Sequence, residues 1–216
     1  MKMKKLFVLI LAVAAVAALV AAQAVVPKAK LPILTTSAGQ SNDVNALNIV
    51  LEEADLKYDY CDVPTPEMVA AGVGLGNKQS AEGFHVESNT DLVKYPKGTP
   101  FKAVIVAIGA SLKGMGASGL TIDTEEARVK KLVDYCKKNK VFLIAVHVGG
   151  EAGRGPAGSD NERMIDAVAP LADFIVVTKD SNKDGRFTKI AEKGKIPFQQ
   201  VDYALGLVDI VKKMFT

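Results

Sequence analysis

Apolar and polar residues follow each other along this chain in blocks that fit strands and helices in alternation. Apolar runs of five or six residues, such as 103–108 and 141–146, are typical of strands buried on both faces of a sheet. Between them lie segments with apolar residues three or four positions apart, the spacing of an amphipathic helix. Strands are predicted at 31–35, 56–63, 103–108, 141–146 and 174–178, with 196–201 as a candidate sixth strand. Helices are predicted at 44–55, 66–71, 124–138, 160–171, 187–193 and 205–215.

Strands that alternate with helices predict the α/β class, with a parallel sheet covered on both faces. We expect a three-layer, doubly wound parallel sheet of about five strands, flavodoxin-like or Rossmann-like. Right-handed crossovers place all the strand-to-helix loops at one edge of such a sheet, where ligands bind. The predicted organisation is a single domain over 31–216, after a short linker at 25–30.

The first 24 residues have the pattern of a secretory signal peptide. Lysines at positions 2, 4 and 5 precede an unbroken apolar run over 6–20, and Ala22-Gln23-Ala24 matches a cleavage site. Fifteen apolar residues are few for a membrane span, which needs about 20. We therefore expect cleavage before Val25 and export of the mature chain to the periplasm or the extracellular space.

Removal of this segment changes the charge balance. The full chain has 27 basic and 24 acidic residues, and three of the lysines lie in the predicted signal. The mature chain is then neutral, which gives no electrostatic reason to expect nucleic-acid binding. No second long apolar stretch predicts a membrane span after signal removal. Cys61 and Cys136 would be able to pair in an exported protein or remain as two buried thiols, and both interpretations stay open.

Four polar, glycine-containing loops follow the predicted strands, at 36–43, 109–119, 147–155 and 179–187. Backbone N–H groups and hydroxyls in such loops orient an anionic or polyhydroxyl ligand, and Lys or Arg neutralises it. None of the loops has the glycine spacing of a Walker A or dinucleotide motif. The predicted ligand-binding residues are Ser37, Gly39, Gln40, Ser41, Ser111, Lys113, Gly114, His147, Gly149, Glu151 and Arg154.

The fourth loop also contains Asp180-x-Asn182-x-Asp184-Gly185, which matches the first half of a calcium loop. The twelfth position, where a bidentate Glu is needed, is Ala191, and a strand rather than a helix is predicted before Asp180. An ordinary Asn/Asp-rich turn therefore explains the pattern better than calcium, and no cofactor is expected.

An irregular region at about 72–100 interrupts the strand and helix pattern, and it is rich in Gly and Pro. A segment of this length inside a compact domain is usually a lid, a binding loop or an insertion. It would be the contact surface if the chain were an accessory or interaction protein of the cell envelope.

The four loops contain the motifs Ser37-Ala38-Gly39-Gln40-Ser41, the 111–119 loop, His147-x-Gly149-Gly150-Glu151 and Lys183-Asp184-Gly185. Together these motifs resemble a family of exported bacterial proteins known only as a domain of unknown function. This resemblance implies a small extracytoplasmic α/β domain and brings no activity or catalytic residues. The 72–98 region looks like an addition to that pattern.

Gly39-Gln40-Ser41-Asn42 is also similar to the nucleophile block of SGNH-type carbohydrate esterases. On that interpretation Ser41 would attack an acyl carbon, with His147 as the base. The other two blocks of those enzymes are missing here. The chain is therefore expected to bind a small polar, anionic ligand at the carboxyl edge of the sheet without catalysis, with an esterase as the alternative.

Overall fold

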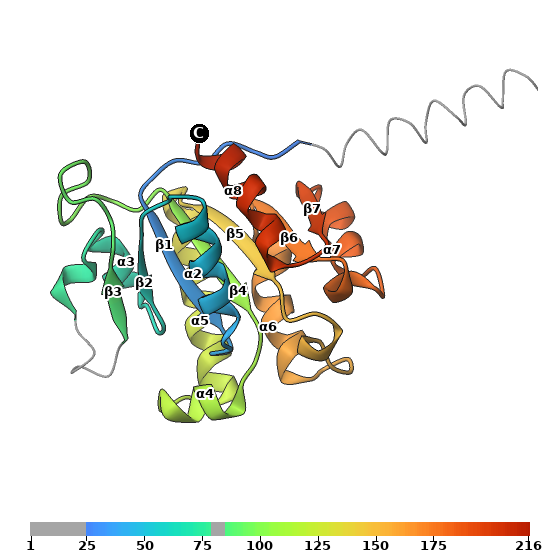
Figure 1. Cartoon of the computed structure of the whole chain (residues 1–216). Helices are drawn as coiled ribbons and strands as arrows, with labels where there is room; N and C mark the ends of the chain where they lie inside the picture. The colour runs from blue at the N-terminus through green and yellow to red at the C-terminus, as the bar shows by residue number, and fades with distance from the viewer. Residues whose placement is uncertain (1–24, 79–84) are drawn as a thin grey trace, which may run out of the picture.

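The computed structural model describes residues 25–78 and 85–216, so the predicted signal peptide lies outside the described residues. A seven-stranded sheet runs through the middle of the molecule (Figure 1). Its order is β3-β2-β1-β4-β5-β6-β7, and all neighbours are parallel except β2 and β3. The strands are β1 Ile33–Ala38, β2 Tyr58–Cys61, β3 Val86–Ser88, β4 Ala103–Ile108, β5 Phe142–His147, β6 Phe174–Thr178 and β7 Phe198–Val201.

Helices of the described residues cover both faces of the sheet. One face packs against α2 Asp43–Glu53 and α8 Leu207–Phe215. The other face packs against α3 Pro66–Ala70, α5 Ile122–Asn139, α6 Asp160–Val168 and α7 Arg186–Gly194. The short α4 Leu112–Ala117 lies beyond the end of β4. The predicted α/β class, with helices on both faces of a mainly parallel sheet, is confirmed.

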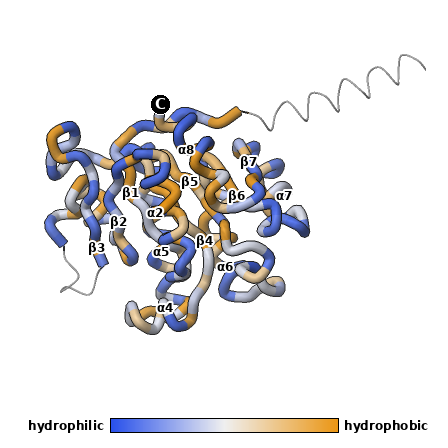
Figure 2. The backbone as a smooth tube through the Cα atoms, viewed as in Figure 1, coloured by the Kyte–Doolittle hydropathy of each residue, from blue (hydrophilic) through white to orange (hydrophobic). Residues whose placement is uncertain are grey.

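The central strands are buried on both faces, which explains their continuous apolar sequences. In β4, Val104 and Ile108 contact the α5 side, while Ile105 and Ala107 contact the α2 side. Successive side chains of a strand point to opposite faces, so a fully buried strand needs an apolar residue at every position. Figure 2 shows the resulting apolar stretches in the central strands and in α2.

The predicted strand count of about five is too low. The additional edge strand β3 has only three residues, is exposed at Glu87 and Ser88, and lies in the region expected to be irregular. Strand β1 also continues to Ala38, which pairs with Ile108 of β4. The hydroxyls of Thr35 and Thr36 donate to carbonyls of β2 and of the loop that follows β2. Hydrogen-bonded threonines are compatible with a buried strand, although their polarity predicts a loop.

The region at 72–100 is attached to the edge of the sheet by a buried carboxylate. Asp59 of β2 is fully buried and accepts hydrogen bonds from the backbone N–H groups of Gly74 (2.7 Å) and Thr90 (3.3 Å). Two distant parts of the region therefore depend on one side chain. The region contains a 3-10 turn at Leu75–Asn77 as well as β3.

Both cysteines are free and buried, on β2 and α5, so the structure contains two thiols rather than a disulfide. Burial raises the pKa of each thiol to about 12. The predicted linker lies along α8, where the backbone N–H of Ala29 donates to Met214 (2.9 Å). Within residues 25–78 and 85–216, none of the helices has the length and apolar character needed to cross a membrane.

Candidate functional site

Four loops meet at the edge formed by the carboxyl ends of the parallel strands, called here the carboxyl edge. Loops one and two pair directly, because Ser111 donates from its backbone N–H to Gly39 (2.7 Å). Loop three adjoins loop one, since a Cβ at Gly149 would lie 2.8 Å from a carboxylate oxygen of Asp43. Loops three and four adjoin in the same way at Gly150 and Asp180.

The strand order changes direction between β1 and β4, because the chain first adds β2 on one side and later adds β4 on the other. In open α/β sheets, ligands bind at the carboxyl edge beside this change of direction. The relevant loops are therefore the one from Gly39 to Asp43 and the one that begins at Gly109.

The first predicted anion site is filled by the protein's own carboxylate. The backbone N–H of Gly39 donates to Oε1 of Glu125 (2.8 Å), and the Gln40 side-chain amide donates to the same oxygen (3.2 Å). Arg128 pairs with both oxygens of Glu125, which is fully buried. Gly39 and Gln40 therefore contact an internal anion in this structure.

Three further predicted residues have structural contacts. Ser37 is buried in β1, and its carbonyl accepts a hydrogen bond from Arg128 (2.8 Å). The Ser111 hydroxyl caps α4 by accepting from the backbone N–H of Gly114 (3.0 Å). A Cβ at Gly114 would lie only 2.1 Å from the Gln40 carbonyl, so this position requires glycine. Lys113 is exposed on α4, a helix that the sequence did not predict.

Ser41 and Asp43 occupy the centre of the carboxyl edge. A carboxylate oxygen of Asp43 lies against both Gly109 and Gly149, where an added Cβ would be 2.8 Å from it. Burial raises the pKa of Asp43 above its ordinary value of 3.8, and a hydrogen bond with the Ser41 hydroxyl opposes that change. The Ser41 hydroxyl also accepts a hydrogen bond from the backbone N–H of Asp43 (3.3 Å), and no side chain of the described residues other than Ser41 bonds to this carboxylate. Asp43 is thus a partly buried acid with capacity to accept more hydrogen bonds.

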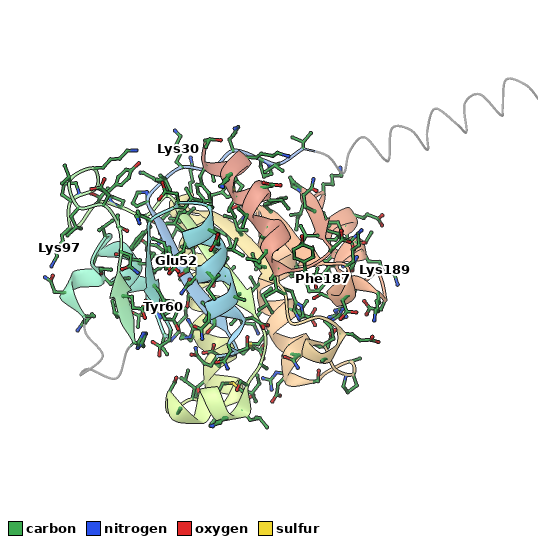
Figure 3. All side chains as sticks on the ribbon, viewed as in Figure 1. Lys30, Glu52, Tyr60, Lys97, Phe187 and Lys189 are labelled. Atoms are coloured by element: carbon green, nitrogen blue, oxygen red, sulfur yellow. The ribbon has the colours of Figure 1, made fainter. Side chains whose placement is uncertain are left out.

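His147 lies at the end of β5, fully buried, and both ring nitrogens have partners. Nδ1 is 2.8 Å from the Ser181 hydroxyl, and Nε2 is 3.2 Å from the Gly153 carbonyl. A carbonyl only accepts, so Nε2 carries the proton and Nδ1 accepts from Ser181. Burial lowers the pKa of His147 to about 4, so the ring is neutral near pH 7. Its ring also packs on Phe187, labelled in Figure 3, with centroids 5.3 Å apart.

Arg154 forms a buried network instead of a free cationic group. Its guanidinium donates to Glu162 (2.8 Å), to the Ser181 carbonyl (2.7 Å) and to both oxygens of Asp184. The guanidinium also lies 5.2 Å from the centre of the Phe187 ring. This pairing lowers the pKa of Asp184. Arg154 was predicted to neutralise a ligand, whereas in the structure its donors are taken by the protein itself.

A pocket of about 290 Å³ opens beside this network at the β5 and β6 loops. Its walls carry charges of both signs that are already paired, as Lys183 bridges Glu151 (2.8 Å) and Asp180 (2.6 Å). The predicted ligand-binding residues Glu151 and Arg154 line this pocket, and Ser41 does not. The lining residues are Glu151, Arg154, Gly155, Asp180, Ser181, Lys183 and Asp184.

The three candidate calcium ligands have separate partners. Asp180 accepts from the backbone N–H of Glu151 (2.9 Å), Asp184 pairs with Arg154, and the Asn182 side-chain oxygen accepts from backbone N–H groups of α7. In the part of the chain that the structure describes, no group of three or more His, Cys, Asp or Glu side chains is arranged to hold a metal ion.

The sequence did not identify Asp43, Glu125 and Arg128 as site residues. Asp43 lies in the first predicted loop, two positions after Ser41, but an acid at the start of a helix already has a local explanation in the helix dipole. Glu125 lies in the first turn of α5, where the helix dipole favours an acid whatever its tertiary contacts. Its contact with Gly39 spans 86 positions and has no local signal in the sequence.

The fold and the edge define an α/β protein with a mainly parallel sheet and polar loops gathered at the carboxyl edge. The chain belongs to the family described as Domain of unknown function (DUF6305), whose model matches residues 30–215. Searches of curated proteins and of solved structures found no match to the chain.

Proposed function

We propose that this protein binds a small polyhydroxyl ligand at the carboxyl edge, in contact with Ser41 and Asp43, and does not transform it. The observation that carries the proposal is the Asp43 carboxylate, which is partly buried, has one side-chain partner and lies between Gly109 and Gly149. Perturbed acids at the carboxyl edge of an α/β sheet are candidates for functional groups. The order of the parallel strands supports a flavodoxin-like arrangement with its site at this point.

The nature of the free groups favours hydroxyls over an anion. Asp43 is an acceptor and would repel a second carboxylate or a phosphate, while ligand hydroxyls would donate to it. Of the groups predicted to attract an anion, Gly39 and Arg154 donate to internal carboxylates, whereas Lys113 is exposed on α4. Ser41 and the exposed Asn42 add hydrogen-bonding groups that suit a polyhydroxyl compound.

The contacts of His147 favour binding over esterase activity. A serine nucleophile needs a base within hydrogen-bond reach. His147 bonds instead to Ser181 and Gly153, and no hydrogen bond joins it to Ser41 in the described part of the chain. Ser41 is hydrogen-bonded to Asp43, and in the proposed function the Asp43 carboxylate accepts hydrogen bonds from ligand hydroxyls and does not replace the histidine base of an esterase.

The test is a thermal-shift screen of neutral sugars and polyols against phosphate, sulfate and acetate, followed by calorimetry on each hit. Asp43→Asn should weaken a polyol about tenfold to a hundredfold, because a hydrogen bond to a charged acceptor contributes about 1.5–3 kcal/mol. Asp55→Asn is the matched control, since Asp55 follows the other end of the same helix.

Stabilisation by phosphate or sulfate that Lys113→Ala removes would support the anionic ligand in place of a polyol. Hydrolysis of acetylated sugars or aryl esters that disappears in Ser41→Ala would overturn the binding function in favour of the esterase. Polyol affinity that is equal in the wild type and in Asp43→Asn would refute the role of Asp43.

We also propose that the protein is exported, on the evidence of its first 24 residues. N-terminal sequencing of the exported form should give Val25 as the first residue. Recovery of the chain from the membrane fraction with Met1 intact would contradict this.

A further inference from the structure

The loop after β1 and the first turn of α5 together surround one carboxylate with four donors. Oε1 of Glu125 accepts from the Gly39 backbone (2.8 Å), the Gln40 amide (3.2 Å) and Nη2 of Arg128 (2.7 Å). Oε2 accepts from Nε of Arg128 (2.7 Å). Arg128 and Gln40 are each about nine-tenths buried, so these bonds form away from water.

We infer that this arrangement is a binding site for a small carboxylate, and that the chain fills it with its own Glu125. The parallel Nε and Nη2 donors of Arg128 match the two oxygens of one planar carboxylate. Backbone and amide donors then select the oxygen nearer the β1 loop. Tetrahedral anions such as phosphate present a different set of oxygen positions and would fit less well.

A second observation shows that the donors exceed what Glu125 uses. Nη1 of Arg128 is buried and has no hydrogen-bond partner among the described residues. Buried donors of a guanidinium are normally paired, because an unpaired one costs free energy. Nη1 lies outside the pair of nitrogens, Nε and Nη2, that holds Glu125, so Arg128 keeps one buried donor beside the bound carboxylate.

In the wild type, the covalent attachment of Glu125 to α5 favours its own carboxylate over a free one at this site. A side chain already attached next to its site acts at a high effective concentration. An external ion must displace it, whereas removal of the Glu125 carboxylate would leave the donors open. Acetate has the size of the methyl-carboxylate unit that Glu125→Ala removes. The site is separate from the one proposed around Asp43, so each can be tested on its own.

The experiment compares the thermal unfolding of Glu125→Ala in sodium acetate and in sodium chloride of equal ionic strength. Acetate at about a hundredfold excess over its dissociation constant should raise the melting temperature by roughly 5–10 °C, in a saturable way. Formate should act more weakly, since it lacks the methyl group. Wild type and Glu125→Gln should show no difference between acetate and chloride.

The matched control is Glu126→Ala, which removes a neighbouring glutamate that pairs on the surface with Arg163 and Lys130. Its response to acetate should equal its response to chloride. The double variant Glu125→Ala, Arg128→Met should lose the acetate effect. Equal melting temperatures of Glu125→Ala in the two salts would overturn the inference.

A second measurement covers the case in which Glu125→Ala does not fold in chloride. Refolding from urea is then followed by far-UV circular dichroism in acetate and in chloride. Recovery of the folded signal in acetate alone supports the site, and failure in both salts contradicts it.

Discussion

Replacing Arg154 by methionine should destabilise the whole domain, because the guanidinium is the partner of a buried acid. Arg154 is about nine-tenths buried and pairs with Glu162, whose side chain is 4% exposed. Breaking a buried ion pair costs about 3–5 kcal/mol, since the remaining charge is left in a medium of low dielectric constant. Arg186 remains 2.7 Å from the other oxygen of Glu162, so the lower end of that range is expected.

The Asp184 side chain adds little to this loss, because it is 58% exposed and water replaces the guanidinium. A loss of about 3 kcal/mol should lower the melting temperature by about 6–12 °C in a domain of this size. Lys113→Met is the control, since an exposed side chain should change the unfolding free energy by less than about 0.5 kcal/mol.

Urea denaturation followed by circular dichroism measures the free energy of unfolding, and calorimetry gives the melting temperature. Arg154→Lys should fall between the wild type and Arg154→Met, as an ammonium retains the charge and loses the two-pronged geometry. An Arg154→Met variant as stable as the control would refute the assignment of Arg154 to the buried network. Full stability with weaker ligand binding would restore Arg154 as a ligand-binding residue.

Three further predictions concern other buried or loop side chains. The free energy of unfolding should fall by about 3 kcal/mol as the pH is lowered from 6.5 to 4, because unfolded His147 binds a proton that the folded form excludes until about pH 4. Urea titrations should show a smaller loss in His147→Gln than in the wild type. An equal loss in both proteins would contradict the prediction. Asp59→Ala should accelerate hydrogen exchange at the amides of Gly74 and Thr90 while β4 stays protected, and unchanged exchange at both amides would refute its role. Millimolar calcium should leave the melting temperature unchanged, since Asp184 is hydrogen-bonded to Arg154. A calcium-dependent rise that Asp184→Ala abolishes would show instead that calcium binds the fourth loop.

The buried strands were predictable because one requirement, burial on both faces of the sheet, determines their sequences. A strand such as 103–108 is apolar at every position, since both of its faces contact helices. Short elements lacked such a signal. Strand β3 has one apolar residue among three, and α4 contains Gly114 and Gly116, which lower its intrinsic helix stability by about 1 kcal/mol each.

The hydrogen-bond partners of the side chains at the carboxyl edge were not predictable, because these bonds join positions that are far apart in the sequence. The sequence placed Gly39, Ser41, His147 and Arg154 in loops at one edge, and the structure brings these loops together. The local pattern gave no information on which donors would meet an internal acceptor. The bond from Arg128 to Ser37, for example, spans 91 positions.

One structural relationship explains why the expected anion donors are occupied. Helices α5 and α6 begin at the carboxyl edge, and each has a first-turn glutamate that is buried beside the loops there. Glu125 of α5 and Glu162 of α6 are both such residues, and the helix dipole favours a negative charge at that end. Each accepts a buried arginine, Arg128 in one case and Arg154 in the other. At these two helix starts the arginine therefore pairs with an internal acid and is not free for a ligand. Asp43 also lies in a first turn, but on the opposite face, and no arginine of the described residues pairs with it. This difference is the physical reason to look for the ligand beside Asp43.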